Sequence, residues 1–198
     1  ADVARMFGWL MSAFLWVYAF VSPFAGAIAD KLNRKWLIIG SLIVWSAVTC
    51  LMGYSETFSQ LLILRGLMGI SEALYIPSAL SLIADWHKDG KRSLAIGMHT
   101  TGLYLGSALG GYGALVANEM SWQYTFHTLG YVGIAYAFVL ILLLKEKRVA
   151  EPDVETKATL AKKESVMAGI SAVLSIGAFW VILFMFAIPS LPGWATQN

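Results

Sequence analysis

Long apolar runs are the feature that most constrains how this chain of 198 residues folds. A helix needs about 20 apolar residues to cross a bilayer, and five runs reach that length. They cover residues 6–29, 36–54, 57–84, 94–117 and 124–144, and a sixth apolar stretch starts at Val166. None shows the alternating polarity of a membrane β-strand, and backbone polar groups in lipid must be paired internally. We therefore expect an all-α integral membrane protein.

The composition agrees with this class and excludes others. Hydrophobic residues make up 58% of the chain and charged residues 13%, against about 45–50% and about 25% in a soluble domain. The formal net charge of +2 gives no indication of a nucleic-acid partner. The sequence has no nucleotide-binding loop, His-Glu-x-x-His site or Gly-x-Ser-x-Gly elbow, which argues against an ATP-driven pump and common membrane hydrolases. We expect no enzyme activity, cofactor or metal site.

Basic residues mark one side of the membrane. Twelve of the 14 Lys and Arg residues fall in alternate segments, at residues 30–35, 85–93 and 145–165. Because cytoplasmic loops carry an excess of Lys and Arg, we expect these segments to be cytoplasmic and Ala1 to lie outside. The polar segment 145–165 contains Pro152, and a connection of this length marks a boundary between two helical bundles. The sequence predicts a multi-pass protein of the plasma (inner) membrane.

The loop after the first run carries the strongest local pattern. Gly26 lets another helix approach closely, and Asp30 is placed to pair with Arg34 or to face a helix N-terminus. The alternative is an ordinary cytoplasmic turn. The pattern resembles the signature loop of the major facilitator superfamily, which latches the cytoplasmic side in the outward-open state, although Asn33 stands where that loop has Gly. The resemblance implies a conformational latch built from Gly26, Asp30, Lys31, Arg34 and Lys35.

Two charges lie inside the third run. Arg65 and Glu72 each cost about 2.5–3.5 kcal/mol at the centre of a membrane helix on insertion scales, so such residues usually face a cavity and have a function. Seven residues are about two turns, which puts both on one face about 10 Å apart. Gly69 lies between them and leaves room for a ligand or a neighbouring side chain. A structural charge network is the alternative to a binding and coupling pair.

The stretch Arg65–Pro77 resembles the fourth helix of two facilitator groups, the anion:cation symporters and the spinster-like lipid carriers. In the symporters, the matching Arg contacts the substrate carboxylate and the matching Glu takes part in proton coupling. The chemistry agrees, because Arg offers a bidentate fork to a carboxylate and a buried Glu is able to cycle its proton. The resemblance implies proton-coupled symport of a small organic anion, such as a sugar acid, by alternating access. The alternatives are a lipid or lysolipid carrier of the same fold and a membrane sensor or enzyme without transport.

The fourth run carries a stripe of small residues from Gly102 to Gly111, which is typical of close helix packing. Drug-exporting facilitators have a similar stripe with Pro where this chain has Ser107, which counts against a drug exporter. His99 and Tyr104 lie on or beside the stripe, and we expect them to line a central cavity with Arg65 and Tyr75 as substrate-binding residues. The alternative for His99 is a packed, hydrogen-bonded side chain.

The resemblance covers residues 6–144 and implies that they are the second to sixth helices of a twelve-helix transporter. Residues 1–144 are then an N-terminal half without its first helix, 145–177 a cytoplasmic linker with an amphipathic segment, and 178–198 the start of the seventh helix. The expected partners are the lipid bilayer, a small anionic substrate and the missing transporter helices in cis. The proton gradient is the expected driving force.

Overall fold

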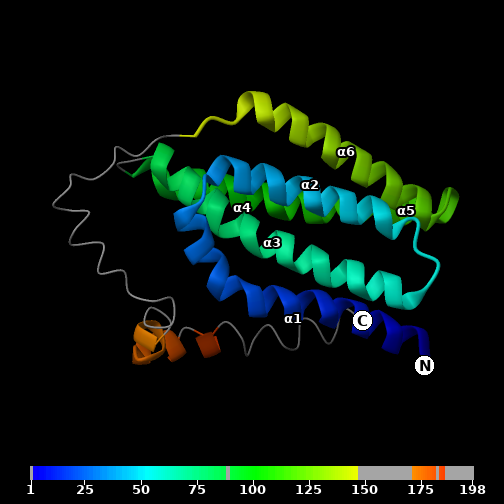
Figure 1. The fold of residues 1–198 in the computed structure, drawn as a ribbon, viewed down its shortest axis with the longest axis horizontal. Coiled ribbons are helices and arrows are strands. Elements are labelled where there is room, and N and C mark those ends of the chain that lie inside the picture. The colour runs from blue at the N-terminus through cyan, green and yellow to red at the C-terminus, as the bar shows by residue number, and fades with distance from the viewer. Residues whose placement is uncertain (1, 88–89, 147–170, 182, 186–198) are drawn as a thin grey trace. The chain divides into compact units, whose positions relative to one another are not determined.

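A computed structural model describes residues 2–87, 90–146, 171–181 and 183–185 (Figure 1). These residues contain helices and no strand, so the all-α expectation is confirmed. Six helices follow one another: α1 (Asp2–Lys31), α2 (Arg34–Met52), α3 (Phe58–Trp86), α4 (Lys91–Gly110), α5 (Tyr112–Glu119) and α6 (Trp122–Leu143). The chain divides into two units, of which Arg5–Val149 contains the candidate site. In the other unit, residues 171–174 and 177–181 are helical.

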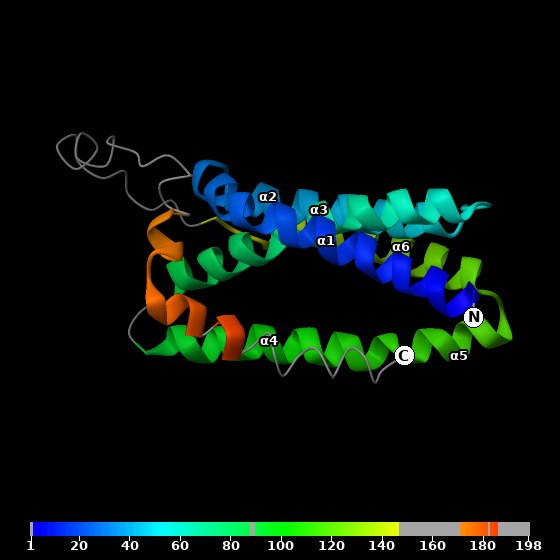
Figure 2. The same ribbon diagram turned by 90° about the horizontal axis from the view of Figure 1, so that it is seen from below.

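Four of the described helices, α1, α2, α3 and α6, are long and apolar enough to cross a membrane. The run 94–117 was expected to form one span, and the structure instead divides it into α4 and α5 at Gly111. There the helix tightens, because the Gly111 N–H donates to the Ala108 carbonyl at 3.2 Å. Figure 2 shows α4 and α5 following one another along a nearly common axis. The two short helices therefore continue in one direction.

Polar side chains define where several helices begin. Asn33 accepts a hydrogen bond from the Trp36 N–H at 3.1 Å and caps α2. Thr57 and Gln60 form a reciprocal capping box at the start of α3, which satisfies backbone donors that have no partner within the helix. Gly90 precedes α4 with φ of 79°, a conformation that glycine adopts without steric cost. The helix starts are thus set by local side-chain chemistry.

The packed centre of this unit is α2, which lies between α3 and α6 (Figure 1). Glycines of α6 allow the closest approach: a Cβ on Gly130 would lie 2.6 Å from the Cβ of Cys50, and one on Gly133 would collide with Ser46. By contrast, a Cβ on Gly102 or Gly106 would meet no described atom within 4 Å. The small-residue stripe of α4 therefore has no packing partner among the described residues.

Candidate substrate and proton-coupling site

Arg65 and Glu72 lie two turns apart on α3, about 10 Å along the helix axis. Both side chains are partly buried. The Nε atom of Arg65 is buried and has no hydrogen-bond partner in the described part of the chain. An unpaired polar group in an apolar medium costs roughly 2–7 kcal/mol. A hydrogen-bond acceptor that binds to this N–H would therefore lower the free energy of the site. The guanidinium is thus chemically available to an anion.

Gly69, between these two residues, does not provide room for a ligand. A Cβ at this position would lie 2.7 Å from the carbonyl oxygen of Phe14 and 3.1 Å from the backbone nitrogen of Tyr18. The space beside Gly69 is therefore filled by the backbone of α1. The sequence left open room for a ligand or for a neighbouring side chain, and the structure instead shows close approach of the α1 backbone to the helix that carries Arg65 and Glu72.

Tyr75 and His99 are brought together from two helices. Tyr75 lies one turn after Glu72 on α3, and its ring centroid is 6.0 Å from that of His99 on α4, with 46° between the ring planes. The Nε2 atom of His99 is buried and has no hydrogen-bond partner among the described residues. The alternative reading of His99, a packed and hydrogen-bonded side chain, therefore finds no hydrogen bond at Nε2 among the described residues.

Tyr104 lies apart from this group. Its side chain is 73% exposed, and it does not border the apolar pocket described below. Five residues separate it from His99, which rotates its position by about 140° around an ideal helix. A side chain on that side of α4 points away from Tyr75. Of the expected substrate-binding residues, the structure therefore brings Tyr75 and His99 together and leaves Tyr104 apart from them.

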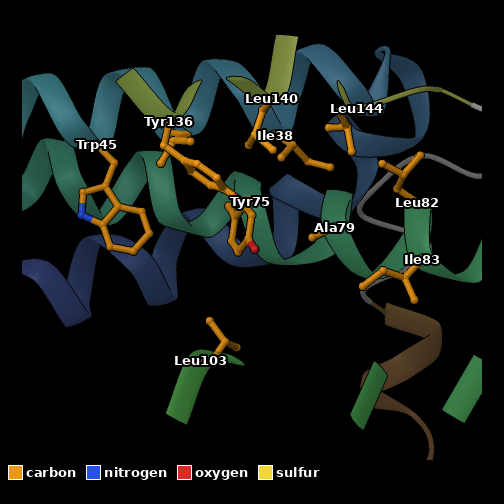
Figure 3. A pocket seen from close by; sticks show the side chains of 11 residues that line it. Ile38, Trp45, Tyr75, Ala79, Leu82, Ile83, Leu103, Tyr136, Leu140 and Leu144 are labelled. Carbon is orange, nitrogen blue, oxygen red and sulfur yellow. The ribbon is translucent and has the colours of Figure 1, made fainter. Parts of the chain in front are cut away.

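An apolar pocket with a volume of about 310 Å³ opens beside Tyr75. Aliphatic side chains of α2, α3, α4 and α6 line it, together with Trp45, Tyr75 and Tyr136 (Figure 3). Neither Arg65 nor Glu72 borders it. From Tyr75 the pocket follows α3 through Ala79 to Ile83, toward the C-terminal end of this helix. The sequence offered no signal for this pocket, because its aliphatic residues are typical of any membrane helix.

The latch residues are arranged differently from the sequence-based expectation. Arg34 pairs with Asp85, near the end of α3, rather than with Asp30. Asp30 is exposed and forms no ion pair among the described residues. The reason is geometric: Arg34 is the first residue of α2, and the C-terminal end of α3 lies beside it. The side chain of Lys31 lies outside the described set.

Further contacts tie the same end of the bundle together. The Arg34 backbone N–H donates to Glu146 Oε1 at 3.1 Å, and Lys35 Nζ donates to the Ile141 carbonyl at 2.9 Å. A Cβ on Gly26 would meet no described atom within 4 Å, so the close helix approach expected there is not observed. Asp85 and Glu146 were missed from the sequence. The sequence feature that could have indicated them is an acidic residue in an otherwise basic loop.

The family assignment follows from comparison with known proteins. The sequence matches the family model of the Major Facilitator Superfamily over residues 4–196. The chain belongs to this superfamily, whose members here are membrane transporters rather than enzymes. The facilitator resemblance of the latch loop and of the Arg65–Pro77 stretch is thereby confirmed.

Three relatives illustrate what the chain is similar to. Protein spinster homolog 1 of Homo sapiens is 30% identical over 70% of this chain and 27% of its own length. The multidrug transporter protein MdtP of Bacillus subtilis is 26% identical over 92% of this chain and 35% of its own length. A D-galactonate transporter of Escherichia coli is 26% identical over 73% of this chain and 34% of its own length. The chain thus spans about a third of the length of the curated relatives that it matches.

A solved structure supports the same fold. The crystal structure of a bacterial homolog of the human lysosomal transporter spinster, in an inward-facing and occupied conformation, matches with a TM-score of 0.58 and 28% sequence identity. The match covers 74% of this chain and 38% of that one. The chain is therefore a multi-pass membrane protein with a facilitator-type helical bundle.

Proposed function

We propose that this chain forms part of a secondary active transporter that imports a small organic anion together with protons. The observation that carries the proposal is the buried, unpartnered Nε of Arg65, two turns from Glu72 on the same membrane helix. Arg65 would hold the carboxylate of the substrate, since a guanidinium is permanently charged and binds carboxylates with a bidentate fork. Similarity to a D-galactonate transporter supports a sugar acid as the substrate class.

Glu72 would couple the transported anion to the proton gradient, which supplies the driving force without a cofactor. A protonated Glu72 is neutral and suits the loaded carrier, whereas release of its proton on the cytoplasmic side resets the site. Facilitators expose a midplane site alternately to each side by rocking two halves. We therefore propose that transport depends on further helices in cis, with the plasma membrane as the site of action and residues 30–35, 85–93 and 145–165 on its cytoplasmic side.

A second candidate is a carrier of lipids or lysolipids. The specific observation in its favour is the apolar pocket of about 310 Å³ beside Tyr75, which is suited to hydrocarbon. In this case Arg65 would hold a phosphate headgroup. The spinster homologues among the relatives support this candidate. The third alternative, a sensor or enzyme without transport, is disfavoured by membership of a transporter family.

The two candidates are separated by uptake into proteoliposomes that contain the full-length protein. We expect radiolabelled D-galactonate or a related sugar acid to accumulate when the outside is made acidic, and lysophosphatidylcholine not to be moved. Arg65→Ala should abolish uptake, and Arg65→Lys should retain part of it because the charge remains while the fork is lost. Uptake that is unchanged in Arg65→Ala would exclude Arg65 as the substrate anchor, and movement of lysolipid alone would favour the second candidate.

A further inference from the structure

Helix α1 contacts α3 between the two charges of the candidate site. Arg65, Gly69 and Glu72 are at positions i, i+4 and i+7, so they share one side of α3. A Cβ on Gly69 would lie 2.7 Å from the Phe14 carbonyl oxygen and 3.1 Å from the Tyr18 backbone nitrogen. The turn of α1 that ends at Tyr18 therefore lies directly beside the middle of the site.

The residues of this turn lie on different sides of the contact. Gly66 is turned by about 100° from Arg65 around α3, and Gly69 lies between the two, about 40° from Arg65. Val17 meets both glycines, at 3.7 Å from a Cβ on Gly66 and 3.4 Å from one on Gly69, whereas Tyr18 meets only Gly69. Tyr18 is therefore on the side of the contact that is nearer to Arg65.

The Tyr18 side chain is also displaced along the helix toward the level of Arg65. Side chains of a helix lean toward its N-terminus, and the ring of Tyr18 lies beside that of Phe14, one turn earlier, with centroids 6.0 Å apart and 26° between the planes. Helices α1 and α3 run in the same direction (Figures 1 and 2). Arg65 is about 6 Å before Gly69 along α3, so the Tyr18 ring is displaced from Gly69 in the direction of Arg65.

The Tyr18 hydroxyl forms no hydrogen bond with the described residues, and the side chain is only partly buried. Ser22, one turn later on α1, differs in this respect, because its Oγ donates to the Tyr18 carbonyl at 2.8 Å. A phenol both donates and accepts hydrogen bonds. A sugar acid has hydroxyl groups besides its carboxylate, and a guanidinium that holds the carboxylate leaves those hydroxyls without a partner. The phenol of Tyr18 has the chemistry to provide one.

We infer that Tyr18 hydrogen-bonds to a hydroxyl group of the substrate whose carboxylate Arg65 holds, an inference that rests on the proposed function. The substrate class is then a hydroxylated carboxylate rather than a simple fatty acid. A site built to hydrogen-bond a hydroxyl group rejects an analogue without it, because a polar group of the site is left unpaired. Tyr18 is thus a specificity-determining residue that α1 contributes to the site on α3.

The test compares two carboxylates in binding to the purified full-length protein. D-galactonate has a hydroxyl group on every carbon beyond the carboxylate, and hexanoate has the same carbon chain without any. Tyr18→Phe keeps the ring beside Phe14 and removes only the hydroxyl. By isothermal titration calorimetry, we expect it to raise the Kd of D-galactonate at least threefold, about the effect of one hydrogen bond, and not to raise the Kd of hexanoate. Tyr124→Phe, in the first turn of α6 and 47% exposed, is the matched control and should change neither Kd.

Two results in Tyr18→Phe would overturn the inference. An equal rise in the Kd of both ligands would mean that Tyr18 shapes the site without reading hydroxyl groups, and an unchanged Kd for D-galactonate would mean that its hydroxyl is not used. Arg65→Ala, measured alongside, separates the two proposals. If Arg65→Ala abolishes D-galactonate binding while Tyr18→Phe has no effect, only the role of Tyr18 fails. If Arg65→Ala binds D-galactonate as tightly as the wild type, the proposed anchor fails as well, and a wild type that prefers hexanoate would contradict both proposals.

Discussion

Arg34 at the start of α2 forms an ion pair with Asp85 at the end of α3. The two side chains are 24% and 22% exposed, so the pair is partly shielded from water. The backbone N–H of Arg34 also donates to Glu146, just after α6. One residue therefore joins the ends of three membrane helices on the side that carries the basic loops. This arrangement is suited to holding that end of the bundle together.

Exchanging the charges tests this pair. We expect Arg34→Asp and Asp85→Arg, each alone, to lower the melting temperature of the detergent-solubilised protein, because each places two like charges side by side. The double variant should recover at least half of the loss, since the opposite charges are restored. Arg92→Asp, at an exposed position near the start of α4, is the control and should have little effect. A double variant no more stable than the worse single variant would show that the ion pair contributes nothing.

Neutralising the carboxylate of Glu72 tests coupling. Glu72→Gln keeps the size of the side chain and removes the titratable proton, so we expect accumulation of substrate against its gradient to be abolished while exchange is retained in part. The measurement is uptake with and without an imposed pH gradient. Glu56→Gln, at an exposed loop position before α3, is the matched control. Accumulation preserved in Glu72→Gln would contradict the coupling role.

The contact between α2 and α6 predicts a strong effect of a single methyl group. A Cβ on Gly130 would lie within 2.6–2.8 Å of Cys50 atoms, two of which are backbone atoms that have no freedom to rotate away. Gly130→Ala should therefore force the helices apart, at a cost of about 1–3 kcal/mol, in the range of overpacked cores. Gly40→Ala on α2, where a Cβ would meet no described atom within 4 Å, is the control. Equal thermal stability of the two variants would contradict the close approach.

A larger side chain in the apolar pocket distinguishes a small organic anion from a lipid as the substrate. Leu103 of α4 lines the apolar pocket and is 45% exposed, so Leu103→Trp fills the pocket without overpacking a buried position. If the substrate is a small anion held at Arg65, its uptake should stay within twofold of the wild-type rate. Leu105→Trp, on the same helix and outside the pocket, is the control. A loss of more than fivefold in Leu103→Trp alone would favour a carrier whose substrate has a hydrocarbon chain.

Much of the fold was accessible from local sequence. Hydrophobicity along the chain located the membrane helices, because a helix in lipid has to hide its backbone within a continuous apolar segment. Capping residues such as Asn33 and Thr57 act on their own helix starts. The interruption at Gly111 was missed, because two adjacent glycines are compatible both with a continuous membrane helix and with a tighter turn.

In the candidate site, too, some residues were predictable from local sequence and some contacts were not. Arg65 and Glu72 were recognisable because a charge in an apolar run is costly wherever the helix packs. The proximity of His99 to Tyr75 and the pairing of Arg34 with Asp85 were not, since each joins residues far apart in sequence: Arg34 and Asp85 are 51 positions apart. Tyr104 is the counter-example, because its helix rotates it away from the group that its sequence position suggested.

By itself, the sequence determined the class of protein and the helix that carries the two charges of the candidate site, and it predicted an orientation in the membrane. These properties depend on the transfer of side chains from water to lipid and on the number of Lys and Arg residues in each loop, and both can be summed along the sequence. Only the tertiary structure decided which groups meet: that α1 fills the space at Gly69, that Asp85 is the partner of Arg34, and that His99 lies beside Tyr75. Such meetings depend on how helices rotate and pack, and short-range hydrogen bonds and ion pairs form only where packing brings their atoms into contact.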